Sequence, residues 1–334
     1  PTDVMSIIHT CAHPAEEILN KFGVDTRNVQ PSAYEGGVDH WVDDNTYYDT
    51  FNVKWKRTEK AVDQHFLHTD GPFHDGKLTV EQVEAYDWPD GKNPGLTKGV
   101  KERVQHIKAN GDHAVCVYIP GGIIHRGYAM RGFESYLKDL YKRPEALQRM
   151  MDKLCDFWCD NATEMIKAAG PENVDIIYFG EDLGTQDSCM FDPGTIYAEY
   201  MKPRHRRMIE TVKGLTNNKA KVCYHCCGSA YHFIPHLLDV GIDALNPVQV
   251  TAKNMEPERL KEEFGDRLTF WGGINTQETL PFGTPEEVVE ETKRIISILG
   301  KGGGYILNSV HNIQAEVPPE NIVAMFETGV NHRY

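Results

Sequence analysis

The chain has 334 residues, of which 40% are hydrophobic and 25% are charged, and its formal net charge at pH 7 is −14. A chain of this length and composition can bury a large core, as one large domain or two ordinary ones, which excludes the disordered and fibrous classes. The acidic balance argues against a nucleic-acid partner, because phosphate binding needs clustered Lys and Arg side chains.

Neither a membrane span nor a disulfide framework is expected. The sequence has no run of about 18 apolar residues, and its start, PTDVMSIIHT, lacks the basic and apolar regions of a secretory signal. We therefore expect a cytoplasmic protein without membrane contact. The eight cysteines are too few and too unevenly spaced for a disulfide framework, so reduced thiols are expected. Cys155 and Cys159, four apart on a predicted helix, are interpreted as packing residues.

The first third of the chain differs from the rest. Residues 2–8 are a candidate first strand, and residues 30–100 follow without a βα period. That second segment is dense in Tyr, Trp, His, Asp and Gly, as in HWVDDNTYYDTFNVKWKR. We predict that it forms an N-terminal aromatic-rich cap or insertion over the mouth of the domain that follows.

From about residue 100 onward, short apolar runs alternate with amphipathic stretches, which is typical of βα units around a parallel sheet. The predicted strands cover residues 114–120, 174–180, 221–227, 244–248, 268–273 and 304–310. Helix starts are predicted at Asp192-Pro193 and Thr284-Pro285, and helix ends at Gly170, Gly241 and Gly265. No G-x-G-x-x-G follows any strand, so the dinucleotide-binding doubly wound sheet has no support. We predict an α/β fold, a single (β/α)8 TIM barrel over residues 1–334 with residues 30–100 as the cap.

In such a barrel the reactive groups lie where strands end at the C-terminal face. Polar side chains at these positions are the candidates for the site. They are His125, Arg126, Glu181, Asp182, His225, Cys227, Asn246, Gln249, Asn275, His311 and Asn312.

The stretch KVCYHCCGSAYH, residues 221–232, carries the most specific chemistry. Side chains alternate along a strand, so His225 and Cys227 are expected on one side, and Gly228 lets the chain turn away. An imidazole and a thiol at this spacing form half of a zinc site. The alternative is that the cysteine packs as a small apolar residue and the histidine is hydrogen-bonded in the core. Glu181 and His311 at other strand ends favour an open metal site of the catalytic type.

Three long segments carry a resemblance to a known family. HCCGSAYHFIPHLLDVGIDALNPVQ, EFGDRLTFWGGINTQETLPFGTPEEV and GGGYILNSVHNIQAEVPPENIVAMFE resemble the uroporphyrinogen decarboxylase superfamily, over about residues 100–330. Within it they resemble the zinc-dependent corrinoid methyltransferases of the O-demethylase and methanogen types. The His-x-Cys-Gly of that branch matches His225, Cys227 and Gly228. Where methanogen enzymes carry a further cysteine this sequence has His311, and the arginine-rich N-terminal motifs of the decarboxylase have no counterpart.

The resemblance implies a (β/α)8 barrel with its site at the C-terminal mouth. It implies a zinc-dependent methyltransferase that moves a methyl group from a small methoxylated substrate, an aryl methyl ether by preference, to the cobalt of a corrinoid (cobalamin) protein. Zinc would be held by His225, Cys227 and Glu181, with Glu181 and His311 in catalytic roles. The substrate contacts would come from Asp182, Asn246, Gln249, Asn275, Asn312, His125, Arg126, Tyr34, Trp41 and Phe73, the last three as aromatic contacts to a flat ring.

Two other functions stay open. One is a metal-independent lyase resembling uroporphyrinogen decarboxylase, in which His311 and Asp182 do acid/base work. The other is a corrinoid- or tetrapyrrole-binding protein without catalysis. The sequence fixes neither the methyl donor nor the oligomeric state, of which a homodimer is one option.

Overall fold

The computed structural model describes residues 4–6, 11–57 and 66–332. The chain divides into two compact units, each described by itself. The first unit comprises Pro1–Ala12, Thr26–Glu181 and Gly194–Lys221, and the second unit comprises His13–Asp25, Asp182–Pro193 and Val222–Tyr334. The expectation of one domain over residues 1–334 stays a prediction.

The first unit contains parallel strands with helices between them. Strands β3 (Thr26–Val29), β8 (Ala114–Tyr118) and β9 (Ile176–Gly180) pair in parallel in the order β9-β8-β3. Val115, Val117 and Ile177 are fully buried, as expected for parallel strands covered on both faces. The helices are α2 (Val80–Ala85), α3 (Val100–Ala109), α4 (His125–Arg131), α5 (Phe133–Lys142), α6 (Pro144–Ala169) and α7 (Lys202–Leu215), with single turns η1 (Pro94–Thr97) and η2 (Pro171–Asn173) and a π-helix η3 (Pro193–Met201).

The predicted cap region forms a separate sheet within the first unit. Strands β4 (His40–Asp43), β5 (Thr46–Tyr48), β6 (Lys54–Arg57) and β7 (Phe66–Asp70) pair antiparallel in chain order. This antiparallel pattern explains why residues 30–100 show no βα period. The placement of this sheet as a cap over a barrel mouth stays a prediction.

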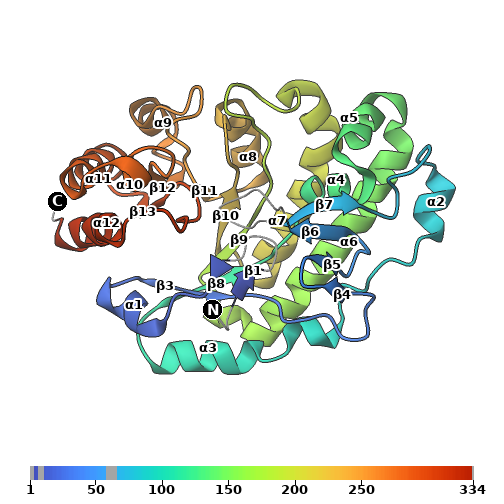
Figure 1. Ribbon diagram of the computed structural model, residues 1–334, viewed down its shortest axis with the longest axis horizontal. Helices are drawn as coiled ribbons and strands as arrows, with labels where there is room; N and C mark the ends of the chain where they lie inside the picture. Colours follow the sequence, from blue (N-terminus) through green and yellow to red (C-terminus); the bar gives the residue numbers. More distant parts are fainter. Residues whose placement is uncertain (1–3, 7–10, 58–65, 333–334) are drawn as a thin grey trace. The chain divides into compact units, whose positions relative to one another are not determined.

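The second unit holds four more parallel strands in the order β13-β12-β11-β10. They are β10 (Lys221–His225, the first residue of which falls in the first unit), β11 (Ala244–Asn246), β12 (Thr269–Ile274) and β13 (Tyr305–Ser309). The helices are α1 (Glu16–Lys21), α8 (Ile234–Val240), α9 (Pro257–Phe264), α10 (Thr279–Phe282), α11 (Pro285–Leu299) and α12 (Pro319–Asn331), with a turn η4 (Tyr231–Phe233). Helices α11 and α12 pack side by side (Figure 1).

The α/β class is confirmed, and the alternation of parallel strands with helices is consistent with a TIM-barrel-like fold. Each of the six strands predicted after residue 100 is present, with ends that differ by at most two residues from the prediction. The first strand is a correction. The described part of residues 2–8 forms β1 (Val4–Ser6), which pairs antiparallel with β2 (Cys11–Ala12), and the first parallel strand is β3.

The helix boundaries follow the local chemistry. Thr284 accepts a hydrogen bond from the Glu287 amide, and the Glu287 side chain accepts one from the Thr284 amide, so α11 begins with a capping box, with Pro285 in the first turn. Helix α8 ends at Gly241, whose φ of 100° suits only glycine well. The predicted ends at Gly170 and Gly265 also coincide with the ends of α6 and α9.

Candidate metal centre

The site is built where β10 ends. His225 is the last residue of β10, Cys227 lies two residues beyond it, and Asp182 begins the loop that follows β9. Gly228 has a φ of 77°, and a Cβ there would lie 2.6 Å from the Thr185 carbonyl oxygen. Glycine therefore allows the chain to turn tightly just after the thiol.

Three donor atoms of different chemistry converge at this turn. The Cys227 Sγ atom lies 3.4 Å from His225 Nε2, and His225 Nε2 lies 3.8 Å from Asp182 Oδ1. The Cys227 amide donates a 2.7 Å hydrogen bond to Asp182 Oδ1. Among the described residues, this is the one group of three or more Cys, His, Asp or Glu side chains whose ligand atoms all lie within 4.8 Å of one another.

The other ring nitrogen of His225 is held by Asn246. Parallel pairing of β10 with β11 places His225 opposite Asn246, and His225 Nδ1 lies 2.8 Å from Asn246 Oδ1. Asn246 Nδ2 donates to the Trp271 carbonyl oxygen at 3.1 Å, which fixes the side-chain amide with its oxygen toward the ring. An acceptor at Nδ1 favours the tautomer that carries its proton there, and in this tautomer Nε2 is the nitrogen whose lone pair could bind a cation.

The loops around the donors are tied by buried polar contacts. Gln249 Oε1 accepts the Gly228 amide at 2.7 Å, and Gln249 Nε2 donates to Gln186 Oε1 at 2.7 Å. The Leu183 amide donates to the sulfur of Cys226, which is fully buried. Cys226 lies outside the donor group, and Gln249, predicted as a substrate contact, links two loops of the site.

The surroundings of Cys227 disfavour its thiolate as long as no cation is near. Burial raises the pKa of the Cys227 thiol well above its usual range, and the Asp182 carboxylate and the Cys226 thiol add to the rise. A thiolate beside a carboxylate is costly unless a positive charge compensates both. Metal coordination deprotonates a thiol outright, so a divalent cation would resolve this conflict.

The donor set fits zinc. Thiolate sulfur, imidazole nitrogen and carboxylate oxygen are its usual ligands, and two ligands at a tetrahedral angle around it lie roughly 3.4–3.6 Å apart. The sulfur–nitrogen distance of 3.4 Å agrees with that spacing, and the nitrogen–oxygen distance of 3.8 Å exceeds it by a few tenths of an ångström. Three protein ligands leave a fourth position for a substrate atom, which is the arrangement of catalytic zinc sites.

The carboxylate in this group is Asp182, whereas Glu181 was the expected ligand. The Glu181 side chain is 1% exposed, and its oxygens accept the amides of Ile123 and Ile124 in the first unit. His205 Nε2 lies 3.7 Å from Glu181 Oε1. The described donor group thus contains Asp182 in place of Glu181. The predicted roles of Glu181, as zinc ligand and as catalytic residue, stay predictions.

The other candidates of the second unit lie outside this group of three donors. His311 is exposed two residues beyond β13, and its carbonyl accepts a hydrogen bond from Ser309. The Asn312 carbonyl lies 3.5 Å from Gln314 Nε2. Asn275 caps a turn, because its Oδ1 accepts the amides of Gln277 and Glu278. Catalytic or substrate roles for these residues stay predictions.

The candidates of the first unit have structural partners of their own. Arg126 forms an ion pair with Asp49 and lies over the Phe51 ring, and His125 packs edge-on against Tyr128. The Tyr34 hydroxyl accepts the Asp90 amide, Trp41 is 49% exposed beside Tyr47, and Phe73 is buried against Tyr86. Their substrate contacts stay predictions.

The parallel strands and their helices place this protein in the α/β class, with a candidate metal-binding group beyond its strand ends. Comparison with known proteins gives the family. The uroporphyrinogen decarboxylase (URO-D) family model matches residues 62–332, so the chain belongs to this family. Uroporphyrinogen decarboxylases from Psychromonas ingrahamii and Hahella chejuensis are 26% and 24% identical over 196 and 195 residues. Each match covers 58% of this chain and 51% of the relative, so the chain spans about half the length of these relatives.

A longer match and a solved structure extend the comparison. The enzyme of the same name from Vibrio campbellii is 23% identical over 270 residues, which cover 78% of this chain and 71% of the relative. A solved structure described as a methyltransferase from Methanosarcina mazei aligns with a TM-score of 0.63 and 16% identity, over 93% of this chain and 81% of that one. This likeness shows the fold. The described helices include none with the length and apolar character needed to cross a bilayer.

Proposed function

We propose that this protein is a zinc-dependent methyltransferase that moves a methyl group from a small methoxylated substrate, of the aryl methyl ether class, to the cobalt of a corrinoid protein. The observation that supports it most is the group of Asp182, His225 and Cys227. A thiol, an imidazole and a carboxylate are together a usual donor set of zinc, and here they converge from the ends of two neighbouring strands. The resemblance of this sequence to the corrinoid methyltransferases, carried by His-x-Cys-Gly, supplies the reaction class.

Each residue has a proposed role in this reaction. Asp182, His225 and Cys227 would hold the metal, which when bound supplies a Lewis acid that stabilises the departing phenolate oxygen. Asn246 orients the His225 ring and sets its tautomer. The nucleophile belongs to the corrinoid partner, so this chain is asked only to bind, orient and polarise the methyl donor.

A second candidate is decarboxylation without a metal. Membership of the URO-D family and the names of the curated relatives favour it. In that case His311 and Asp182 would do the acid/base work, and His225 and Cys227 would be structural. The methyltransferase named among the solved structures is compatible with the first candidate, but at 16% identity it supports the fold alone.

One experiment separates the two. The protein is incubated with a reduced corrinoid protein and, in turn, aryl methyl ethers, methanol, methylamine and methylthiol, while methyl-cobalt absorbance and the demethylated product are followed. Uroporphyrinogen decarboxylation is measured in parallel. We expect methyl-cobalt formation that a chelator abolishes, that added zinc restores, and that Cys227→Ala removes.

The control is Cys189→Ala, which removes a thiol of the same unit that lies outside the donor group and should leave the rate unchanged. Decarboxylation that persists at full rate in chelator, with no methyl transfer from any donor, would establish the second candidate instead.

A further inference from the structure

The Cys227 thiol lies between two backbone amides that side chains hold in place. The Cys227 amide donates a 2.7 Å hydrogen bond to Asp182 Oδ1, and the Gly228 amide donates one of 2.7 Å to Gln249 Oε1. These amides belong to the two planar peptide groups on either side of the Cys227 Cα atom. Holding both planes fixes the direction in which the thiol leaves the backbone.

Gln249 bonds to both loops of the site. The residue is 5% exposed, and both ends of its amide are engaged, because Oε1 accepts the Gly228 amide and Nε2 donates to Gln186 Oε1 at 2.7 Å. Unlike Asp182, it lies outside the group of three donors. Any effect of Gln249 on a metal therefore passes through the Gly228 amide and the loop that carries Gln186.

The two loops that this side chain joins carry two of the three donor atoms. Gln186 lies four residues beyond Asp182 in the same loop. The Ser229 amide donates to the Thr185 carbonyl oxygen at 2.8 Å, and a Cβ at Gly184 would lie 2.6 Å from the Ser229 carbonyl oxygen. The turn with the thiol and the loop with the carboxylate are therefore in close backbone contact, and a shift of one displaces the other.

We propose that Gln249 is a positioning residue of the metal centre, which holds the Cys227 thiol at its distance from His225 through the Gly228 amide. The inference rests on the metal site of the proposed function, and not on the reaction carried out there. The 3.4 Å between Cys227 Sγ and His225 Nε2 matches the separation of two ligands of one zinc ion. Donors that already stand at this separation lose less conformational freedom when a metal binds.

Gln249→Met removes both hydrogen bonds and keeps an unbranched, flexible side chain in the buried position. The Gly228 amide is then buried without its acceptor, which is costly. We expect the turn to shift until this amide finds another acceptor, and the Cys227 thiol to move with it. Metal affinity should fall by about 10–100-fold, the range found when a group that orients a metal ligand is removed.

The test uses cobalt(II), which takes the same sulfur, nitrogen and oxygen donors as zinc and absorbs strongly when a thiolate is bound. The purified full chain is titrated with cobalt, and the affinity and the thiolate-to-cobalt absorbance per bound ion are recorded. For Gln249→Met we expect the loss of affinity given above and a weaker thiolate band at saturation. Gln186→Met keeps the bond to Gly228 and should lose affinity only several-fold.

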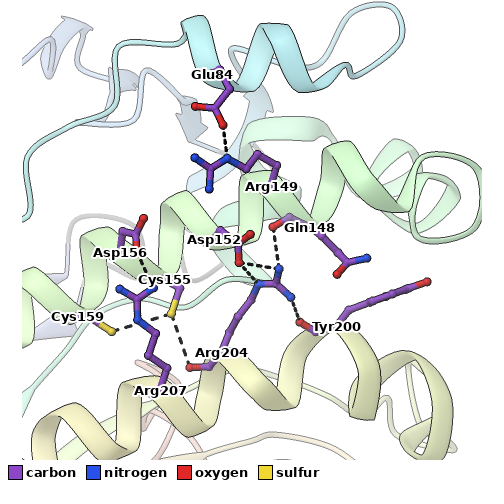
Figure 2. Close-up of polar contacts among 10 residues, drawn as sticks. All are labelled: Glu84, Gln148, Arg149, Asp152, Cys155, Asp156, Cys159, Tyr200, Arg204 and Arg207. Atoms are coloured by element: carbon purple, nitrogen blue, oxygen red, sulfur yellow. Dashed lines mark hydrogen bonds and ion pairs between the residues drawn. The ribbon is translucent and has the colours of Figure 1, made fainter.

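Two controls separate positioning from general stability. Arg204→Met removes contacts between α7 and α6, in which Arg204 donates to the Asp152 carboxylate and to the Gln148 carbonyl oxygen (Figure 2). It should lower the melting temperature and leave cobalt binding unchanged. Gln277→Met removes a 2.6 Å hydrogen bond from Thr251 within the second unit, and it should also leave the cobalt affinity and the thiolate band unchanged.

The proposal is wrong if Gln249→Met binds cobalt like the wild type, or if it lowers only the melting temperature, as Arg204→Met does. If Gln249→Met does not fold, the exposed Gln186 decides, and wild-type cobalt affinity in Gln186→Met overturns the proposal. Wild-type protein that binds no cobalt overturns both this inference and the metal centre. The titration contains no methyl donor, so failure of the proposed methyl transfer is a separate result.

Discussion

Asp182 and Glu181 are neighbours in the sequence with different surroundings. Glu181 is buried under two backbone amides, whereas Asp182 is about one-third exposed and lies beside His225. Asp182→Asn removes the anionic ligand, and we expect it to lower zinc affinity by at least tenfold. Glu181→Gln should keep the zinc and lose thermal stability. Zinc affinity by chelator competition and melting temperature, measured on both variants, check this, and loss of zinc from Glu181→Gln alone would restore Glu181 as the ligand.

Asn246 is expected to act on the metal through His225. Removing its side chain in Asn246→Ala leaves His225 Nδ1 without its 2.8 Å partner, and zinc affinity should fall by about 10–100-fold. Asn246→Asp retains an acceptor at that position and should stay close to wild type. Chelator competition on the two variants measures the difference, and equal affinity of Asn246→Ala and wild type would rule out the orienting role.

Gly122 shows how tightly the buried carboxylate is enclosed. A Cβ at this position would lie 1.8 Å from Glu181 Oε1, so Gly122→Ala must displace a buried carboxyl side chain. We expect the free energy of unfolding to drop by about 1–3 kcal/mol or more, measured by urea denaturation. Gly214→Ala is the matched control because nothing lies within 4 Å of its Cβ, and it should be neutral or slightly stabilising. Equal effects of the two substitutions would contradict this account.

At the scale of elements, strand β10 shows what the sequence could predict. Parallel strands buried on both faces appear as continuous apolar runs, so β8 to β13 were found within two residues. β3, with the polar sequence TRNV, has no such run and was missed. Strand alternation predicted that His225 and Cys227 lie on the same side. However, β10 ends at His225, so Cys227 lies beyond the strand, just before the turn at Gly228.

The partners of these side chains could not be predicted in the same way. The contact between His225 and Asn246, two residues 21 apart in the chain, depends on the register of strands β10 and β11. Whether Glu181 or Asp182 faces the thiol depends on where the chain leaves β9. Hydrophobic patterns place strands but do not fix the directions in which side chains leave the strand ends. The approach of His225 and Cys227 was therefore predictable from the sequence, and the approach of Asp182 was not.

The antiparallel sheet predicts a pH dependence. His68 in β7 packs against the rings of Trp55 and Tyr128, and its Nδ1 is buried with no hydrogen-bond partner among the described residues. Burial lowers the pKa of His68, and His74 and Arg126 lower it further. Below pH ~6.5 the unfolded state therefore binds a proton at His68 more readily than the folded state does. The free energy of unfolding that neutral His68 contributes at neutral pH is consequently lost as the pH falls.

We therefore expect His68→Phe to lose less of its free energy of unfolding than wild type when the pH falls from about 7.5 to about 5. These two values lie about one pH unit or more above and below the reference pKa of histidine. Urea denaturation at the two pH values measures the loss. His106→Gln, which removes an exposed histidine of α3, is the control. The same pH dependence in His68→Phe and wild type would show that His68 titrates alike in the folded and unfolded states.

At the scale of the whole molecule, family membership and the donor group point to different reactions. The URO-D family model covers residues 62–332, and the curated relatives are decarboxylases at about one-quarter identity. A shared fold hosts different reactions through the residues at its strand ends. The net charge of −14 leaves docking of an acidic partner unfavourable, so a corrinoid protein that binds here is expected to present a basic or neutral face.

The measurement that tests the central claim most directly is zinc X-ray absorption on the purified wild-type protein and on Cys227→Ser. We predict about one zinc per chain in the wild type, with one sulfur near 2.3 Å and nitrogen or oxygen ligands near 2.0–2.1 Å. In Cys227→Ser the sulfur ligand should be absent and the zinc content reduced. A wild-type protein without zinc after growth and purification in zinc, or a zinc shell without sulfur, would contradict the account.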